Sequence, residues 1–490
     1  MAGIGFELKR LFKKRSVFST IFAGAYATIV TIGPNLIVIL ALNLMYLLPP
    51  YAEMTYRDRE VLSSTILYVF IFALILVAGV NILLSKHMAD KVYSEDYDGI
   101  ASAVEAGNLL VAGLTALLGI PFGCAMYWVG HLPLYYIFIA YIFFSGLSFT
   151  FFYMSIATIL KEYRRITYSF LGSFAVSLLL ACVCVYWKLL PMRDIILLSL
   201  AVGFTLIAML MCTHIRRTFP VHGEKGWELL GSLKKNLPLL LANEFYVMGL
   251  YAHNFVFWFC SHFSIVVANV FWSAPTYDMA TYLAMLSNIS IQVIFVVNVE
   301  TKFHTAYKTY CESVVGAADK DIRRAKRDMV ETLRRETLYI IQIQSIVNIL
   351  VYLAAITVLP RLGIEGLTMT MYPVLSVAYM IIYLVQCLMI YLYYLNDVWG
   401  AAAVGFTLLV GVTAGSLVAA KLPPAQAGLG AAFGGLCAFT VCFFRIRHIL
   451  IHLDDHIFGK GRIVPRVRSR GAHSVTTIYK FRKEGQEGSR

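Results

Sequence analysis

The chain has 490 residues, of which 59% are hydrophobic and 14% are charged, and its formal net charge is +13. Soluble proteins are about half apolar and about a quarter charged, so this composition, with a mean hydropathy of +0.72, excludes a water-soluble globular enzyme. The nine cysteines form no CxxC pair and no cluster with histidine. They are typical of small core residues rather than of disulfides or metal ligands, and we expect neither a metal nor another cofactor.

The beginning of the chain predicts an amphipathic helix on the membrane surface. Ile4, Leu8, Leu11 and Phe12 recur at helical spacing, and lysine and arginine fill much of the remainder. Such a helix places its apolar face in the bilayer interface and is attracted by anionic lipid. We therefore expect an interfacial helix over 1–16.

Runs of at least 18 residues without lysine or arginine predict the membrane spans, because a helix needs roughly 20 apolar residues to cross a bilayer. Twelve runs qualify, at about 17–48, 61–85, 104–129, 132–160, 166–187, 195–213, 237–262, 277–299, 337–359, 371–395, 398–420 and 426–444. The first is about thirty residues long, whereas the core of a cleavable signal peptide has about 7–15. The sequence thus predicts an all-α polytopic membrane protein with twelve transmembrane helices, the first of which is retained.

The placement of lysine and arginine predicts the orientation, because cytoplasmic loops carry an excess of both. With the N-terminus inside, the cytoplasmic segments hold 35 of the 41 basic residues and the outer loops hold six. We expect both termini in the cytoplasm. The positive net charge then reflects membrane topology, and we expect no nucleic-acid partner.

The spans fall into two groups of six, which suggests a duplication. Because both groups begin inside, they would be related by a pseudo-two-fold axis along the membrane normal, with a cavity between them, as in transporters. After the interfacial helix, the expected parts are a six-helix bundle (17–213), a basic cytoplasmic connector (214–236), a second six-helix bundle (237–444) with a cytoplasmic helical loop (300–336), and a basic cytoplasmic tail (445–490).

Polar residues within apolar spans are candidates for function, because burying them in a bilayer costs free energy. The seventh span has the most polar stripe of all, formed at spacings of three and four residues by Asn243, Tyr246, Leu250, Asn254 and Trp258, with Glu244 and His253 beside it. Two interpretations stay open. The stripe is either a cavity wall that contacts a hydroxyl-rich substrate, with Glu244 as a proton or cation site, or a set of interhelical hydrogen bonds that fixes packing.

Two further spans carry candidates. In the first span, Pro34 and Asn35 follow Gly33, and proline there kinks or breaks the helix because it removes one backbone hydrogen bond. Broken helices often flank transport sites, although plain proline kinks are equally common. The eighth span offers Gln292, Asn288 and Asn298 as candidates for a polar path, and the ninth span offers Gln342, Gln344 and Asn348.

The loop at 300–336 mixes basic and acidic side chains, as a solvated helix does. Its arginines are Arg323, Arg324, Arg327, Arg334 and Arg335. One interpretation is an ordinary loop helix, and the other is a docking surface for a cytoplasmic partner.

Missing motifs restrict the chemistry. The sequence has no Walker A motif, no HExxH and no nucleophile elbow, so we expect no enzymatic activity of those kinds. No lysine or arginine lies within an expected span, although cationic groups would suit a diphosphate-linked substrate. This favours a neutral substrate.

The opening Met1-Ala-Gly-Ile-Gly-Phe-Glu-Leu8, the basic amphipathic stretch and the twelve spans in two halves resemble the PelG family. The resemblance implies an exporter of the Pel exopolysaccharide in the bacterial inner membrane, within the multidrug/oligosaccharidyl-lipid/polysaccharide flippase superfamily. It further implies a MATE-like fold of two six-helix bundles around a central cavity and a polymer rich in N-acetylgalactosamine. The implied partners are a cytoplasmic glycosyltransferase like PelF and membrane proteins like PelE and PelD, the last a cyclic-di-GMP receptor. The resemblance supplies no site residues.

Three alternatives remain. A drug or small-metabolite antiporter would be driven by Na⁺ or H⁺ through Glu244 or another acid. A membrane-embedded glycosyltransferase or ligase would need a carboxylate or arginine cluster in an outer loop, and these loops are short. A scaffold subunit would recruit the synthase without moving the polymer.

Overall fold

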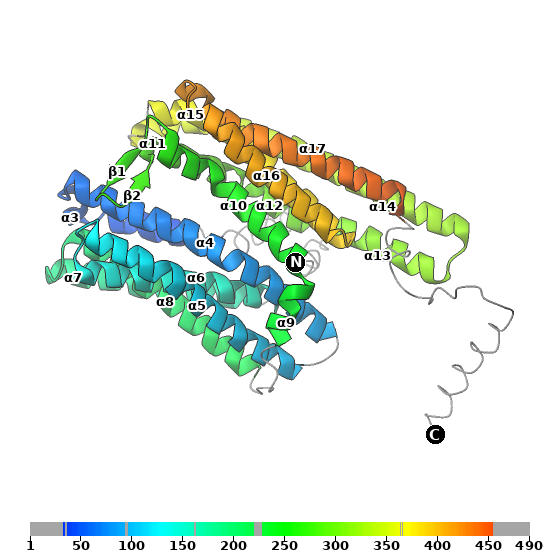
Figure 1. The fold of residues 1–490 in the computed structure, drawn as a ribbon, viewed down its shortest axis with the longest axis horizontal. Helices are drawn as coiled ribbons and strands as arrows, with labels where there is room; N and C mark the ends of the chain where they lie inside the picture. The colour runs from blue at the N-terminus through cyan, green and yellow to red at the C-terminus, as the bar shows by residue number, and fades with distance from the viewer. Residues whose placement is uncertain are drawn as a thin grey trace, which may run out of the picture. The chain divides into compact units, whose positions relative to one another are not determined.

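The computed structural model describes residues 33–453 apart from 35–36, 94–96, 161–162, 220–227, 363 and 365, and the chain is mainly helical (Figure 1). The chain divides into two compact units, Met1–Phe444 and Arg445–Arg490. The expected interfacial helix at 1–16 lies outside the described residues, as does the tail beyond residue 453.

The first half contributes five long helices that coincide with the expected second to sixth spans: α4 (Tyr56–Tyr93), α5 (Tyr97–Trp128), α6 (Leu134–Ile159), α7 (Tyr163–Tyr186) and α8 (Met192–Thr218). They are preceded by helical residues 37–46 and by the short α3 (Pro49–Ala52). Helix α6 packs against α4 and α8, and the rings of Phe70, Phe143 and Phe204 meet there at centroid distances of 5.7–6.0 Å. The first half therefore has an aromatic core of its own.

The second half begins with α9 (Glu228–Lys235) and α10 (Leu237–Cys260), which is followed by a hairpin of two antiparallel strands, β1 (Ile265–Val267) and β2 (Phe271–Ser273). The remaining elements are α11 (Pro275–Asn288), α12 (Ser290–Ile294), the π-helix η1 (Phe295–Glu300), α13 (Thr301–Gly316), α14 (Asp319–Val358), η2 (Pro360–Leu362), α15 (Leu367–Tyr394), α16 (Val398–Ala419), η3 (Pro424–Gln426) and α17 (Leu429–Ile451). Helix α10 packs on α16, and α11 packs on α15.

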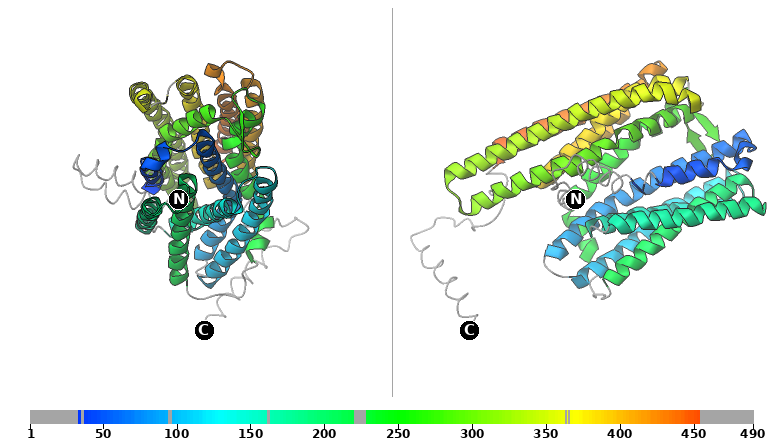
Figure 2. Two further views of the ribbon diagram at one scale, coloured as in Figure 1. Left: turned by 90° about the vertical axis from the view of Figure 1, so that its left-hand side faces the viewer. Right: turned by 180° about the vertical axis from the view of Figure 1, so that it is seen from behind.

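Nine of the described helices are long and apolar enough to cross a membrane: α4 to α8 and α14 to α17. The expected seventh and eighth spans correspond to α10 and to the series α11, α12 and η1, and the first span is described only at 33–34 and 37–46. Figures 1 and 2 show that most of these helices run lengthwise along the molecule. We call the end that carries β1 and β2 the hairpin end, and the end that carries α9 and α13 the connector end.

Apart from the hairpin β1–β2, which the all-α prediction did not include, the structure departs from the sequence expectation in three places. The eighth span is not one helix but breaks at Ile289 and continues through η1. The loop at 300–336 consists of α13 and the first part of α14, which runs on into the ninth span as one helix of 40 residues. No glycine or proline interrupts that helix, and Asp319 and Asp321 in its first turn favour the helix dipole.

The third departure concerns helix ends. Helix α8 continues to Thr218 and α17 to Ile451, beyond the expected ends at 213 and 444. Both helices carry basic residues in the last turn, Arg216 and Arg217 in α8 and His448 in α17. Positive charge there interacts favourably with the helix dipole, so both helices extend past their apolar runs.

Candidate functional site

Helix α10 carries the polar stripe and contacts both halves, because it packs against α16 of its own half and α4 of the first. The side-chain amide of Asn243 donates a hydrogen bond to the backbone oxygen of Ala78 on α4 at 2.8 Å. Beside it, a Cβ placed on Gly79 would lie 3.2 Å from Oε2 of Glu244. Asn243 and the partly buried Glu244 therefore lie where the two halves cross.

One turn further along α10, Tyr246 takes part in a polar chain within the second half. Its hydroxyl donates to Oε1 of Gln386 on α15 at 3.3 Å, and Nε2 of Gln292 on α12 donates to the same oxygen at 3.2 Å. Tyr246 is 3% exposed. The two predicted residues thus meet through Gln386, which the sequence analysis did not single out.

His253 is fully buried between two tyrosines. Its Nδ1 lies 2.9 Å from the hydroxyl of Tyr277 on α11, and its Nε2 lies 3.0 Å from the hydroxyl of Tyr379 on α15. A neutral imidazole has one donor and one acceptor, so one tyrosine donates to the ring and the other accepts from it. His253 joins α10, α11 and α15.

Asn254 and Trp258 both donate to a buried carboxylate, that of Asp278 in the first turn of α11. Nδ2 of Asn254 lies 2.8 Å from Oδ1, and Nε1 of Trp258 lies 2.9 Å from Oδ1 and 3.0 Å from Oδ2. The backbone N–H of Ala274 donates to Oδ2 at 3.1 Å. Four donor contacts thus surround this carboxylate.

The break between α11 and α12 is occupied by side-chain amides. Oδ1 of Asn288 accepts from Nε2 of Gln344 at 3.2 Å and from Nδ2 of Asn348 at 3.1 Å, both on α14. Nδ2 of Asn288 donates to the backbone oxygen of Ser376 on α15 at 2.9 Å. Three of the residues that the sequence suggested for a polar path, Asn288, Gln344 and Asn348, therefore bond to one another between α11 and α14, whereas Gln342 on α14 is exposed.

The two remaining candidates belong to the first span. Pro34 is buried within a helical stretch, and Asn35 lies outside the described residues.

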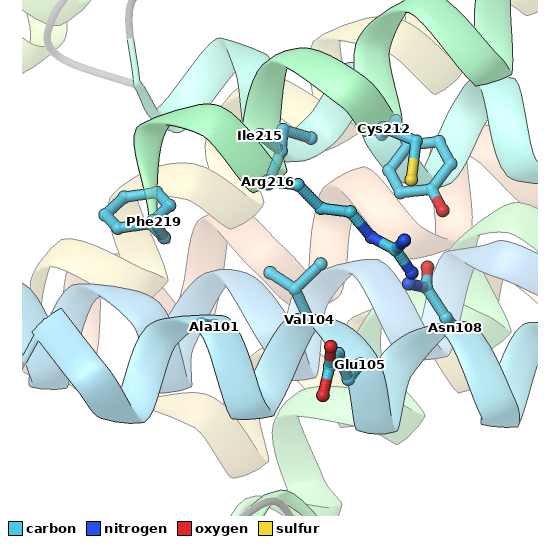
Figure 3. A pocket seen from close by; sticks show the side chains of 9 residues that line it. Ala101, Val104, Glu105, Asn108, Cys212, Ile215, Arg216 and Phe219 are labelled. Carbon is cyan, nitrogen blue, oxygen red and sulfur yellow. The ribbon is translucent and has the colours of Figure 1, made fainter. Parts of the chain in front are cut away.

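Two hollows in the described part of the chain do not suit a sugar. Figure 3 shows the first, between α5, α6 and α8, where the side chain of Arg216 points toward Asn108 above Glu105. Its volume of about 10 Å³ holds roughly one water. The second, of about 280 Å³ between α10 and α16, has an almost wholly apolar lining that includes Met248, Phe255 and Phe259.

All five arginines proposed for docking have exposed side chains on the connector-end part of α14: Arg323, Arg324, Arg327, Arg334 and Arg335. Arg323 pairs with Asp319 at 2.5 Å, and Nε of Arg335 lies 3.4 Å from Oε1 of Glu336. The buried carboxylate of Glu336 also accepts from Nζ of Lys302 at 3.0 and 2.9 Å, which ties α14 to α13.

An aromatic cluster adjoins this ion pair. The ring of Phe303 on α13 meets those of Tyr391 and Tyr394 on α15 at centroid distances of 4.7 and 5.6 Å. His304 lies beside Tyr394, and burial together with the nearby Lys308 lowers the pKa of its imidazole below the usual value. The connector end of the second half is therefore well packed around α13.

The profile of the family described as "PelG: Putative exopolysaccharide Exporter (EPS-E)" matches residues 1–458. The chain belongs to the PelG family. No curated protein matches the chain in sequence.

Solved structures similar to this member of the PelG family are transporters. An outward-facing multidrug resistance MATE family transporter of the MOP superfamily gives a TM-score of 0.60 at 14% identity, over 88% of this chain and 96% of that chain. An inward-facing multidrug resistance MATE family transporter gives a TM-score of 0.56 at 14% identity, over 93% of this chain and 99% of that chain. A MOP superfamily transporter from Pyrococcus furiosus gives 0.61 at 14% identity, over 87% and 96%.

Identities this low establish the fold alone, and that fold is MATE-like, as the resemblance to the PelG family implied. Family and fold together make this chain a membrane transporter of the exopolysaccharide exporter family. Its substrate, its partners and its orientation are matters for proposal.

Proposed function

We propose that this chain exports a neutral, N-acetylgalactosamine-rich exopolysaccharide, Pel, from the cytoplasm to the periplasm across the bacterial inner membrane. The family match over residues 1–458 carries the proposal. The polymer would pass between the two halves while a cytoplasmic glycosyltransferase like PelF lengthens it.

The charges of the first half agree with a neutral cargo. Arg193 is one of the basic residues that the helices add to the predicted spans, because α8 begins at Met192. Its guanidinium pairs with Asp58 at 2.7 Å and with the buried Asp194 at 2.9 Å. This positive charge is compensated within the first half, which favours a neutral polymer over an anionic one.

The orientation follows from the basic residues. The segments expected in the cytoplasm hold 35 of the 41 lysines and arginines, and they include α9 and α13. We place the connector end in the cytoplasm and the hairpin end toward the periplasm, with both termini cytoplasmic.

Within the halves, the polar residues of α10 are the proposed path residues. Asn243 and Glu244 are the best placed, because they lie at the crossing of α4 and α10. Tyr246, His253, Asn254, Trp258 and Gln292 bond to neighbouring helices within the second half, so a path through them would have to exchange those bonds for bonds to sugar hydroxyls.

The exposed arginines of α14 are the proposed docking surface for the glycosyltransferase, with membrane proteins like PelD and PelE completing the assembly. Reversing Arg324 and Arg327 to glutamate should lower co-purification of the glycosyltransferase at least fivefold. The matched control reverses Arg216 and Arg217, which are also exposed but lie on α8. Equal loss in both variants would indicate general charge attraction and contradict this surface.

The proposed export is tested in sealed inverted membrane vesicles that contain this chain, the synthase and the membrane partners. Labelled UDP-N-acetylgalactosamine is supplied outside, and added glycosidase removes any polymer that stays there. We expect protected polymer only when this chain is present. Equal protection without it would contradict export and leave a scaffold role. Vesicles with this chain but without the synthase should make no polymer, because we propose that the chain is not an enzyme.

A second candidate is an ion-coupled antiporter of small molecules. The observation that favours it is the partly buried carboxylate of Glu244 at the crossing of the halves, in a fold shared with multidrug transporters. In this case Glu244→Gln should abolish transport at normal expression, and the chain should work without a synthase. Polymer protection that survives both Glu244→Gln and an ionophore would exclude this candidate.

A further inference from the structure

The hairpin β1–β2 has a strained tip. Its three-residue turn places Ala268 and Asn269 at φ 48° and 56°, in the left-handed region that costs a residue with a Cβ roughly 1–2 kcal/mol. The backbone bond from Val270 N–H to Val267 O, at 3.2 Å, closes the turn. Positive φ at these residues is what a tight hairpin turn requires, and the tip approaches Gly130 of the first half.

Tyr68 on α4 holds the second strand of the hairpin. Its hydroxyl donates to the backbone oxygen of Trp272 at 2.8 Å and accepts from the backbone N–H of the same residue at 3.0 Å. One hydroxyl thus satisfies both the N–H and the C=O of Trp272, on the edge of β2 that faces away from β1. The first half supplies the hydroxyl, and the second half supplies the strand.

The ring of Tyr68 lies among aromatic rings from both halves. It stacks on Trp258 of α10 with a centroid distance of 4.8 Å and an interplanar angle of 6°. Phe122 of α5 and Phe271 of β2 approach it at 5.7 and 5.2 Å. Stacked and edge-to-face pairs of this kind contribute about 0.5–1.5 kcal/mol each beyond their area.

The hairpin tip lies against the loop between α5 and α6. A Cβ placed on Gly130 would come within 2.7 Å of the backbone oxygen of Met126, 3.0 Å of Cγ2 of Val270 and 3.2 Å of the backbone oxygen of Ala268. A side chain here would press on its own loop and also on the hairpin tip. The tip and the second strand therefore meet the first half at two separate places.

The base of the hairpin is fixed differently, because its partners belong to the same half. Trp258 is held by the carboxylate of Asp278, and that carboxylate also binds Ala274 directly after β2. The contacts with the first half are two hydrogen bonds to one hydroxyl and contacts between rings and small residues. These contacts with the first half can separate without leaving a buried charge. Separating the base of the hairpin from Asp278 would leave the buried carboxylate without its donors.

We propose that the hairpin is an exit gate carried by the second half and closed by Tyr68 of the first. This inference rests on the proposed function and orientation, which place the hairpin end where the polymer leaves. The structure shows the closed gate. A polymer that passes between the halves separates Tyr68 from Trp272 and Trp258, and the gate closes again when the ring and the hydroxyl return.

The gate is tested by distances between the halves at the hairpin end. Lys188, between α7 and α8, and Lys421, after α16, are exposed there. Each is replaced by p-acetylphenylalanine and spin-labelled through its ketone, because the chain has nine cysteines of its own. Double electron–electron resonance in lipid nanodiscs then reports how far apart the halves lie, and it needs no substrate.

Tyr68→Phe removes both hydrogen bonds and keeps the ring, so the population at longer distances should rise at least twofold. The matched control is Tyr135→Phe, whose hydroxyl donates to Asp194 within the first half at 2.9 Å, and it should leave the distribution unchanged. Gly130→Val should act like Tyr68→Phe by displacing the tip, whereas Gly172→Val, which meets open space, should not. A native distribution in both Tyr68→Phe and Gly130→Val would overturn the gate.

A second experiment measures the same distances while the polymer is being made. With the synthase, the membrane partners and UDP-N-acetylgalactosamine present, the labelled native chain should also shift toward longer distances. If it does not shift while the vesicle assay shows protected polymer, the polymer leaves elsewhere and the inference fails although export stands. If Tyr68→Phe opens the hairpin end but no polymer is protected, the gate exists and the proposed export fails.

Discussion

Nδ2 of Asn243 on α10 donates a hydrogen bond to the backbone oxygen of Ala78 on α4 at 2.8 Å, and so joins the two halves directly. The next residue on each helix is also at the contact, since Glu244 lies over Gly79. The two ends of the polar stripe thus contact the first half, Asn243 through this hydrogen bond and Trp258 by stacking on Tyr68. Between them, Tyr246, His253 and Asn254 bond to residues of the second half, a difference that the sequence could not reveal.

The first prediction concerns the crossing itself. Gly79→Val would place atoms against Oε2 of Glu244 and Cγ of Leu240, which lie 3.2 and 3.3 Å from a Cβ at that position. Overpacking typically costs about 1–3 kcal/mol, so the free energy of unfolding in mixed micelles should fall by that amount. Gly113→Val on α5, which meets nothing within 4 Å, should leave it unchanged. Equal values for the two variants would contradict a close crossing.

A second prediction decides between packing and substrate contact at His253. His253→Phe leaves the hydroxyl of Tyr277 without the ring nitrogen that it contacts now, whereas the hydroxyl of Tyr379 keeps its bond to the backbone oxygen of Leu250 at 3.4 Å. An unsatisfied buried polar group costs about 1–3 kcal/mol, so the variant should lose about 1–3 kcal/mol of unfolding free energy. Adding Tyr277→Phe and Tyr379→Phe should recover part of that loss.

The opposite pattern would favour substrate contact at the same position. In that case His253→Phe would retain its unfolding free energy and lose export in the vesicle assay, and the two additional tyrosine changes would restore nothing.

The third prediction concerns the carboxylate of Asp278. Asparagine has the same shape as aspartate but a single acceptor oxygen. In Asp278→Asn the new NH₂ group therefore faces an N–H of Asn254, Trp258 or Ala274, and two donors meet without an acceptor. We expect a loss of about 1–3 kcal/mol in unfolding free energy and a change in tryptophan fluorescence from Trp258. Glu312→Gln, in an exposed pair with Lys308 at 3.6 Å, is the control and should change neither. An unaltered Asp278→Asn protein would show that the buried network contributes little.

The helices could be predicted because a bilayer leaves a strong signal in composition. Long apolar runs bounded by basic residues located the nine described helices that are long and apolar enough to cross a membrane, α4 to α8 and α14 to α17. The spacing of three and four residues placed Asn243, Asn254 and Trp258 on one side of α10. That periodicity identifies a face of a helix, but it does not identify what lies opposite. Gln386 and Tyr379, which contact this face, are ordinary members of an apolar span when the sequence is read alone.

The hairpin escaped prediction for a related reason. Its strands have three residues each, too few for an alternating pattern to emerge, and they lie between two apolar runs. Helix α14 shows the reverse case: the change from charged to apolar residues near 336 marks the edge of the membrane, but the backbone continues through it as one helix. Composition reports the environment of a segment. Where a helix ends depends instead on backbone hydrogen bonding and on residues such as glycine and proline, which terminate helices.

The last prediction concerns the ion pair that ties α13 to α14. The side chain of Glu336 is 3% exposed and that of Lys302 is 49% exposed. Removing the lysine leaves a buried carboxylate whose remaining ion-pair partner among the described residues is Arg335, at 3.4 Å. Breaking a fully buried pair costs about 3–5 kcal/mol, and the half-exposed lysine reduces this to about 1–2 kcal/mol. Lys302→Ala should therefore lower the unfolding free energy by that amount, whereas Lys308→Ala in an exposed pair should change it by less than about 0.5 kcal/mol.

Charge exchange separates this pairing from simple loss of a side chain. The double variant Lys302→Glu with Glu336→Lys should recover part of the stability that Lys302→Glu alone loses, because the two carboxylates of the single variant repel each other at the distance where the pair now bonds. If the double variant were as unstable as the sum of the single changes, α13 would be held by the aromatic contacts of Phe303 instead. In that case the backbone amides of residues 301–316 would be protected from hydrogen exchange to the same extent in Lys302→Ala and in the native chain.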